Sequence, residues 1–238
     1  MTYAKRFDGR KPDQIREMEA KIGIIKRADG SAMFRMGKTI AIAAVYGPRE
    51  LFPAFLQEPA RGRLKVIYDL LSFSVTERKK PGPSRRSTEV SMVTENSLEP
   101  ALNLTKFGYT GLDIYIYITQ ADAGTRCAGI NAATLALVDA GIPMKDLVAA
   151  VAVGKVSDKI VVDLNKEEED HPDGATDMPV AMMPRTGKIT LLQLDGSMTK
   201  DEIKQALEMA KKACQEINKV QIKALKEKYM EAEKWMTT

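Results

Sequence analysis

The segment ADAGTR, residues 121–126, combines groups that can bind an anion. A strand-like run, LDIYIYIT, precedes it and a helix-like run from Cys127 follows it, so we expect a strand that turns into a helix start. Unpaired backbone N–H groups and the helix dipole attract phosphate at such a start. Thr125 adds a hydroxyl donor and Arg126 adds a planar guanidinium. An ordinary helix cap followed by a surface arginine would have the same sequence, so other residues must decide between the two interpretations.

Two adjacent arginines, Arg85 and Arg86, form the second candidate group. They stand in the run SRRSTE, between a basic stretch that contains proline and glycine and a helix that we predict from Thr88 to Leu104. Paired guanidinium groups at a helix start can bind successive phosphates of a nucleic acid. A solvated basic loop is the alternative, and spacing alone does not exclude it.

Asp177 and Asp170 are the candidate acidic groups. Asp177 stands immediately before the apolar run MPVAMM, which indicates a buried strand from Pro179 to Met183, and Asp170 lies seven residues earlier. A carboxylate at the end of a strand can act as a general acid or bind a divalent cation. Acidic loops are usually solvated, however, and Asp177 could instead cap a turn.

An anion-binding turn, an arginine pair and a carboxylate are the groups that a nucleic-acid backbone and a small phosphate would together require. Other chemistries have less support. The chain has one histidine, His171, and two cysteines, so we expect no zinc site. The run 37–39, GKT, resembles part of a nucleotide-binding loop, but the glycine required before it is replaced by Ala32.

Strands and helices alternate along the chain in a pattern that predicts an α+β fold. We expect strands at 21–26, 31–35, 39–46, 64–70 and 112–119 before a helix at 123–140, then strands at 147–153, 159–164, 179–183 and 189–193 before a long helix from 200 to about 235. These cycles indicate two related β–α halves, which we expect to pack into a single domain spanning residues 1–238. Apolar residues recur at helical spacing in the last helix, so one of its faces should pack on the core.

Composition limits the possible partners and locations. Hydrophobic residues make up 44% of the 238 residues, which is enough for a substantial core. The net charge of +4 does not suggest a surface that coats nucleic acid, so any binding residues must be clustered. We find no apolar run long enough to span a membrane, and the charged N-terminus lacks a signal core, so we expect a cytoplasmic protein.

Six collinear segments of the chain resemble the RNase PH family, and more narrowly its catalytic subunits in archaeal exosomes. The segments are RFDGRKPDQIR (6–16), DGSAMFRMGKTIAIAAVYGPRE (29–50), SFSVTERKKPGPSRRSTEVS (72–91), LEPAL (98–102), QADAGTRCAGINAATLALVDAGIPM (120–144) and ATDMPVAMMP (175–184). The resemblance implies the RNase PH fold, with its long C-terminal helix. It also implies a phosphate-dependent 3′-to-5′ exoribonuclease that releases nucleoside diphosphates and can add RNA tails in reverse.

The resemblance implies roles for the cationic residues. Gly124, Thr125 and Arg126 would hold the attacking inorganic phosphate, which is then a co-substrate. Arg85 and Arg86 would bind the terminal phosphates of the RNA. Because both reactants are anions, catalysis must consist mainly of positioning and electrostatic stabilisation.

The resemblance also implies that Asp177 acts at the scissile bond, with Asp170 as its acidic neighbour. Asp177 would either protonate the departing 3′ oxygen or bind Mg²⁺, and the sequence does not choose between these roles. Arg61 would lie on a basic pore loop that touches incoming RNA. Many relatives carry an arginine near the position of Tyr109, and some carry a basic residue near that of Glu95, so this chain has less positive charge around the expected RNA path.

The resemblance implies protein partners as well. A related inactive RNase PH-like subunit would alternate with this chain in a six-membered ring of three heterodimers, under a cap of RNA-binding subunits. One alternative is an RNase PH-type homo-hexamer that trims transfer RNA, but the ADAGTRCAG and SRRSTE runs favour the ring subunit. The others are a non-catalytic RNA-binding ring subunit and hydrolysis by a metal-bound water.

Overall fold

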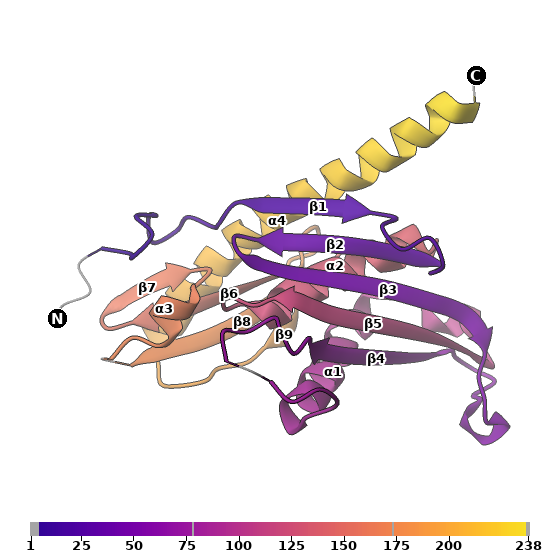
Figure 1. Cartoon of the computed structure of the whole chain (residues 1–238), viewed down its shortest axis with the longest axis horizontal. Coiled ribbons are helices and arrows are strands. Elements are labelled where there is room, and N and C mark those ends of the chain that lie inside the picture. The colour runs from indigo at the N-terminus through magenta and orange to yellow at the C-terminus, as the bar shows by residue number, and fades with distance from the viewer. Residues whose placement is uncertain (1–4, 78, 173, 237–238) are drawn as a thin grey trace.

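Two β-sheets enclose a central helix, as Figure 1 shows for the computed structural model of the chain. The structure describes residues 5–77, 79–172 and 174–236, the last six by their backbone alone. The first sheet has the strand order β1 (Met18–Ile22), β2 (Gly30–Met36), β3 (Thr39–Glu50), β5 (Thr110–Gln120) and β4 (Arg63–Leu70), and only the β4–β5 pair is parallel. The second sheet is antiparallel, with the order β7 (Lys159–Val162), β6 (Ala149–Val156), β8 (Ala175–Met183) and β9 (Lys188–Leu192). The predicted α+β fold with two β–α halves is confirmed.

Strand β5 shows why one face of the first sheet is buried. Leu112, Ile114, Ile116 and Ile118 are buried, and the residues between them point to the opposite face, as the period of two requires. Ile116 packs against the helix between the sheets, so the buried row faces the core. The strand predicted from this alternation is therefore confirmed.

The central helix α2 (Thr125–Asp139) is buried on nearly all sides. Alanines and one glycine occupy many of its positions, so both sheets can approach its backbone closely. A side-chain carbon added at Gly129 would lie 3.1 Å from Ile116, which is tighter than most packed contacts. The helix ends before Gly141, whose φ of 73° suits glycine and stops the helix. The prediction of a helix at 123–140 is confirmed to within two residues.

Helix α1 (Arg85–Leu98) begins three residues earlier than predicted and ends earlier as well. Ser84 caps it through a reciprocal pair of hydrogen bonds with Ser87, so the helix starts directly at the arginines. A short 3-10 turn, Glu99–Ala101, follows, and Pro100 in that turn lacks the N–H that a continuing helix needs. Arg85 and Arg86 are therefore the first two residues of a helix.

Strand β8 also starts earlier than predicted, so Asp177 lies within a strand and the prediction of its place was wrong. The ladder with β6 continues to Ala175 and pairs Asp177 with Gly154. A four-residue helix that the sequence did not predict, α3 (Lys166–Glu169), precedes β8 and is capped by Asn165. Strand β8 and helix α3 together set the positions of Asp177 and Asp170.

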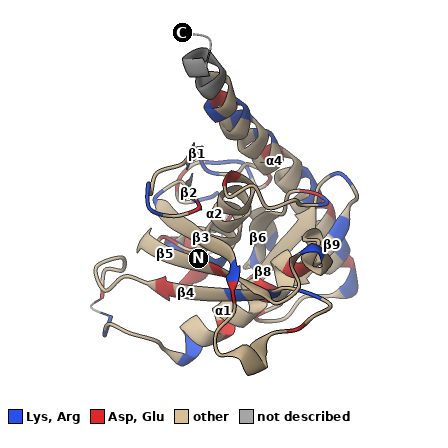
Figure 2. Ribbon diagram, turned by 90° about the vertical axis from the view of Figure 1, so that its right-hand side faces the viewer, with Lys and Arg blue, Asp and Glu red and all other residues tan. Residues whose placement is uncertain are grey.

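The long helix α4 (Lys200–Met236) covers the second sheet and continues beyond it (Figure 1). Ala210, Cys214 and Ile217 are fully buried in the predicted apolar stripe. Basic and acidic residues mix along the part that extends away from the sheets (Figure 2), which is typical of a solvated helix face. Among the described residues, none of the helices combines the length and the apolar character that crossing a membrane requires.

The two halves share one hydrophobic core, and we propose that they form a single domain. Buried residues of both sheets, α2 and α4 belong to one cluster. Asn131 on α2 links the halves directly, because its amide donates to Ala150 O at 2.9 Å and accepts from Ala150 N at 2.8 Å. We expect the chain to unfold in one cooperative transition, with equal calorimetric and van't Hoff enthalpies. Two resolved transitions in scanning calorimetry would contradict the single domain.

Candidate active site

A cleft lies where the starts of α1 and α2 meet strand β8. Two cavities of about 910 and 850 Å³ share several wall residues, among them Arg86, Arg126 and Asp177, and so form one continuous cleft. Seven of the eight predicted site residues line it: Arg85, Arg86, Gly124, Thr125, Arg126, Asp170 and Asp177. Residues separated by up to 92 positions, Arg85 and Asp177, are thus brought together by the packing of α1 and α2 on the second sheet.

The turn before α2 has the geometry of an anion site. Gly124 is the N-cap and adopts a left-handed conformation, with φ of 62°, which glycine tolerates best. Because glycine has no side chain, the first N–H groups of α2 have no side-chain cap at this residue. Thr125 is nearly buried at the first helical position, beside these groups. The helix start predicted from the sequence is therefore present and open to a ligand.

Neighbouring side chains hold this turn in place. Thr39 Oγ1 donates to Ala123 O at 2.7 Å and accepts from Asp122 N at 3.0 Å. Ala123 also has a positive φ, 55°, which is uncommon for a residue other than glycine. The polypeptide thus enters the helix by two successive left-handed residues, and the buried Thr39 hydroxyl stabilises the first of them.

The N-terminal strap, residues 5–17, fastens the turn to the second half of the chain. Arg16 Nε and Nη2 donate to the two carboxylate oxygens of Asp163 at 2.8 and 2.7 Å. Burial lowers the pKa of Arg16, but the nearby carboxylates, Asp163 foremost, raise it, and the net shift is upward. Arg6 makes a similar forked pair with Glu168, at 2.8 and 2.7 Å. Both carboxylates are fully buried, and Arg10 also approaches them, at 3.4 Å from Asp163 and 4.0 Å from Glu168. The loss of Arg16 or Arg6 would therefore leave a buried carboxylate with weaker pairing, which destabilises the fold.

Arg126 and Asp177, which line the cleft, each contain a buried polar atom that has no partner among the described residues. Arg126 Nη1 donates to Gln193 Oε1, but Arg126 Nε is buried and has no hydrogen-bond partner among the described residues. Asp177 Oδ1 is also buried without such a partner. Unsatisfied buried polar atoms are costly and rare in folded proteins. A ligand with anionic oxygens and a proton-accepting or metal-bound group would satisfy both atoms.

The two arginines of α1 extend the positive side of the cleft. Arg85 and Arg86 are exposed, and the first turn of α1 contains no acidic residue. Their guanidinium groups therefore remain available at a helix end whose dipole already favours anions. This arrangement suits consecutive phosphates along a strand rather than one isolated ion.

Burial raises the pKa of Asp177, while the nearby guanidinium of Arg126 lowers it. Asp195 adds to the increase and Arg86 opposes it, and the net shift is upward. The backbone of Asp177 is fixed by mutual hydrogen bonds with Asp195, at 3.0 and 2.8 Å. A raised pKa favours the protonated form of the carboxyl, which suits a group that donates a proton.

Asp170 lies at the edge of the cleft, and Glu169 lies deeper. The Asp170 carboxylate is 62% exposed and pairs with Lys166 at 2.8 Å. Glu169 faces both cavities, and burial, followed by the charge of Asp177, raises the pKa of Glu169. Glu169 is thus the residue of the acidic run that interacts electrostatically with Asp177. The sequence did not single it out, because it stands in a run of four acidic residues, 167–170, and only the turn of α3 decides which of them faces the cleft.

Arg61 is the one predicted site residue outside the cleft. Its guanidinium pairs with Glu99 at the end of α1, and it is not among the residues that line either cavity. Glu95 and Tyr109 are the two positions at which we expect less positive charge than in relatives. Glu95 accepts a hydrogen bond from Val66 N at 3.2 Å and so connects α1 to β4. Tyr109 is 54% exposed, with φ of 64°.

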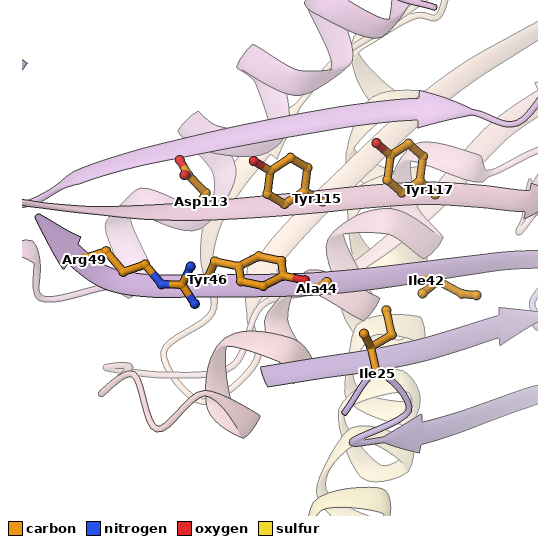
Figure 3. A pocket seen from close by; sticks show the side chains of 8 residues that line it. All are labelled: Ile25, Ile42, Ala44, Tyr46, Arg49, Asp113, Tyr115 and Tyr117. Carbon is orange, nitrogen blue, oxygen red and sulfur yellow. The ribbon is translucent and has the colours of Figure 1, made fainter. Parts of the chain in front are cut away.

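A second pocket, of about 490 Å³, lies on the other face of the first sheet (Figure 3). Tyr46, Tyr115 and Tyr117 line it from β3 and β5, together with Arg49 and Asp113. Arg49 stacks over the Tyr46 ring at 5.0 Å, so its cation already has an aromatic partner. This pocket lacks the helix starts and the arginine pair and is not the candidate active site.

Comparison with known proteins agrees with the geometry. The profile of the 3′ exoribonuclease family, domain 1 (RNase_PH), matches residues 14–143, and that of domain 2 matches residues 146–213. The chain is 55% identical to exosome complex component Rrp41 of Thermococcus kodakarensis, over 95% of this chain and 90% of that protein. It is 53% identical to exosome complex component Rrp41 of Methanopyrus kandleri, over 94% and 93% of the two chains.

Two solved structures share the fold. Rice (Oryza sativa) Rrp46 superposes with a TM-score of 0.79 at 25% identity, covering 91% of this chain and 98% of that one. A chain of the Archaeoglobus fulgidus exosome with RNA bound to the active site superposes with a TM-score of 0.77 at 22% identity, covering 91% and 92%. These similarities support the architecture described above.

Proposed function

The chain belongs to the RNase PH family of 3′ exoribonucleases and is a phosphorolytic 3′-to-5′ enzyme, and we propose that the cleft between α1, α2 and β8 is its active site. One observation carries this proposal: an open helix start, an arginine pair and a carboxyl with a raised pKa converge there from separate segments. Inorganic phosphate is the attacking group, and a nucleoside diphosphate leaves.

Each group has a distinct proposed role. Gly124, Thr125 and Arg126 hold inorganic phosphate, and the unsatisfied Arg126 Nε supplies one donor. Arg85 and Arg86 hold the last RNA phosphates so that the scissile phosphorus faces the attacking oxygen. A bond forms between phosphate oxygen and phosphorus, the bond to the 3′ oxygen breaks, and that oxygen takes a proton. The exchange of one phosphate linkage for another makes the reaction readily reversible.

Asp177 is proposed to act on the departing 3′ oxygen, with Asp170 as a more distant acidic neighbour. Its raised pKa suits proton donation. The described residues contain no group of three or more His, Cys, Asp or Glu side chains that could hold a metal ion. Mg²⁺ nevertheless often binds one carboxylate together with water and substrate phosphates, which the unpartnered Asp177 Oδ1 fits. When bound, the ion would supply charge stabilisation at the leaving oxygen.

We further propose that this chain works as the catalytic subunit of an archaeal exosome. Its relatives are exosome complex components, and its cleft contains acidic as well as basic residues, among them Glu89, Glu169 and Asp195. A related inactive subunit would supply further positive charge in a six-membered ring of three heterodimers, with RNA-binding cap subunits above. Arg61 would contact RNA at the pore of that ring. Cys127 and Cys214 are both buried and unpaired, which supports the expected cytoplasmic location.

The defining test is the dependence on phosphate. With its ring partner, the chain should shorten RNA from the 3′ end only in the presence of inorganic phosphate and release nucleoside diphosphates. A high concentration of nucleoside diphosphate should reverse the reaction and extend the RNA. Mass analysis of the products identifies the attacking group, because hydrolysis would give monophosphates.

The same experiment examines the assembly. Light scattering should show a hexamer after mixing with the partner, and the chain alone should have little activity. Full activity of a homo-hexamer would favour the RNase PH-type alternative, and absence of activity in the assembled ring would favour the non-catalytic one. Equal degradation in phosphate-free buffer would contradict phosphorolysis itself.

A further inference from the structure

Gln193 holds the guanidinium of Arg126 at the wall of the cleft. It is the first residue after β9, and its backbone N–H donates to Pro179 O of β8 at 3.2 Å. Its side-chain oxygen, Oε1, accepts the hydrogen bond from Arg126 Nη1, and both residues line the same cavity. An amide is neutral, so it restrains the guanidinium and leaves the positive charge uncompensated.

Two other arginines of the chain show what such a restraint leaves free. In Arg6 and Arg16, Nη1 donates to a backbone carbonyl oxygen, although Arg16 Nη1 also lies 3.5 Å from the Asp122 carboxylate. Nε and Nη2 share the other edge of the planar group, and they donate to both oxygens of one carboxylate. That carboxylate is Glu168 for Arg6 and Asp163 for Arg16. A held Nη1 thus accompanies an edge that forks around an anion.

Arg126 shows the first half of this pattern without the second. Gln193 holds its Nη1, while its Nε is buried and has no hydrogen-bond partner among the described residues. A buried donor without a partner is costly, which favours a ligand at this edge. Two oxygens of a phosphate match the Nε–Nη2 edge as two oxygens of a carboxylate do.

The restraint matters because the cleft also contains carboxylates that compete for Arg126. Asp177, Glu169 and Asp195 line the same cavity, and the charge of Arg126 acts on Asp177. A guanidinium released from Gln193 would be free to turn toward one of these carboxylates. Its fork would then hold a residue of the protein instead of the phosphate.

We propose that Gln193 is a positioning residue for the attacking phosphate: it holds Arg126 Nη1 so that the Nε–Nη2 edge grips two phosphate oxygens. The inference rests on the proposed function, because it takes Arg126 as part of the phosphate site. Gln193 acts through Arg126 and adds no negative charge that would repel the anion.

The test uses Gln193→Leu in the assembled complex, which removes the acceptor oxygen and keeps a side chain of similar size. The KM for phosphate should rise about tenfold, as expected for one hydrogen bond to a charged group, with little change in the KM for RNA. The melting temperature should stay close to that of the wild type, because Gln193 is only half-buried. Gln205→Leu is the matched control, because Gln205 is exposed on α4 and lines neither cavity, and its KM for phosphate should not change.

A double-mutant cycle with Arg126→Lys separates positioning from general packing. Lysine keeps the charge but has no fork that must be aimed. The rise in KM for phosphate in the double variant should therefore lie well below the product of the two single rises. A rise equal to that product, or an unchanged KM in Gln193→Leu while the wild type requires phosphate, would overturn this inference alone. A wild-type complex that needs no phosphate would instead overturn the proposed function, and this inference with it.

Discussion

Asp177→Asn is expected to lower turnover by about 10²-fold or more while RNA binding persists or tightens. The substitution keeps the shape of the side chain, whose backbone is fixed within β8, but removes its acidic proton and its ability to carry a negative charge. Proton donation to the 3′ oxygen is lost, and so is any contribution to a bound Mg²⁺. Repulsion of the RNA phosphates falls as well, which is why binding should not suffer. Single-turnover rates and RNA affinity, measured on the same assembled complex, distinguish these effects.

Asp170→Asn is the matched control, because it makes the same change at an exposed carboxylate paired with Lys166. It should cost much less turnover than Asp177→Asn. The pH dependence gives a second test. If Asp177 donates the proton, turnover should fall as pH rises through its raised pKa, and Asp177→Asn should lack that decline. Turnover of Asp177→Asn within about threefold of the wild type, well below the loss typical of an absent general acid, would remove Asp177 from the mechanism.

Replacing both arginines of α1, Arg85→Glu with Arg86→Glu, is expected to abolish RNA engagement at the active site. The change converts two positive charges at a helix start into two negative ones. These repel the RNA phosphates and neutralise the positive end of the helix dipole that would otherwise attract them. Single alanine substitutions should weaken binding and reduce the slope of log K against log salt by roughly 0.7 to 1 for each lost phosphate contact. Affinities measured over a series of salt concentrations test this.

Lys211→Glu with Lys212→Glu provides the matched control. These neighbouring residues are exposed on α4, so the substitution reverses the same number of charges on a helix without touching the cleft. RNA affinity should change little in this variant. An unchanged salt slope in Arg85→Ala and in Arg86→Ala would show that both arginines only face solvent.

Local patterns predicted the scaffold well where one signal dominated. The alternation in β5 and the long apolar run of α2 both identified their elements, because β5 is buried along one face and α2 is buried nearly all round. Boundaries were less accurate where tertiary pairing decided them. The first strand was expected at 21–26 but lies at Met18–Ile22, because its pairing with β2 sets the register. The apolar residues of that segment are compatible with a strand at either the expected or the observed position.

The candidate site likewise contains residues that the sequence could predict and residues that it could not. The helix start at Gly124 and the arginine pair were visible from sequence because each occupies one continuous segment. Glu169 was hidden among other acidic residues, and Asp195 gains its place only through its backbone contacts with Asp177 in β8. No periodicity or spacing reports such contacts. The location of Asp177 inside a strand likewise follows from pairing with β6 rather than from its own neighbours.

The N-terminal strap has a consequence for biosynthesis. Arg16 and Arg6 find their carboxylate partners 147 and 162 residues later in the chain. On the ribosome, therefore, the first segment to emerge must stay hydrated until Asp163 and Glu168 have left the exit tunnel. The turn at Gly124 is synthesised long before it is locked, since Arg16 fastens the turn and Asp163 at once. A nascent chain halted before Asp163 would thus carry every residue that we propose to bind phosphate and still lack the Arg16–Asp163 pair that fastens the turn.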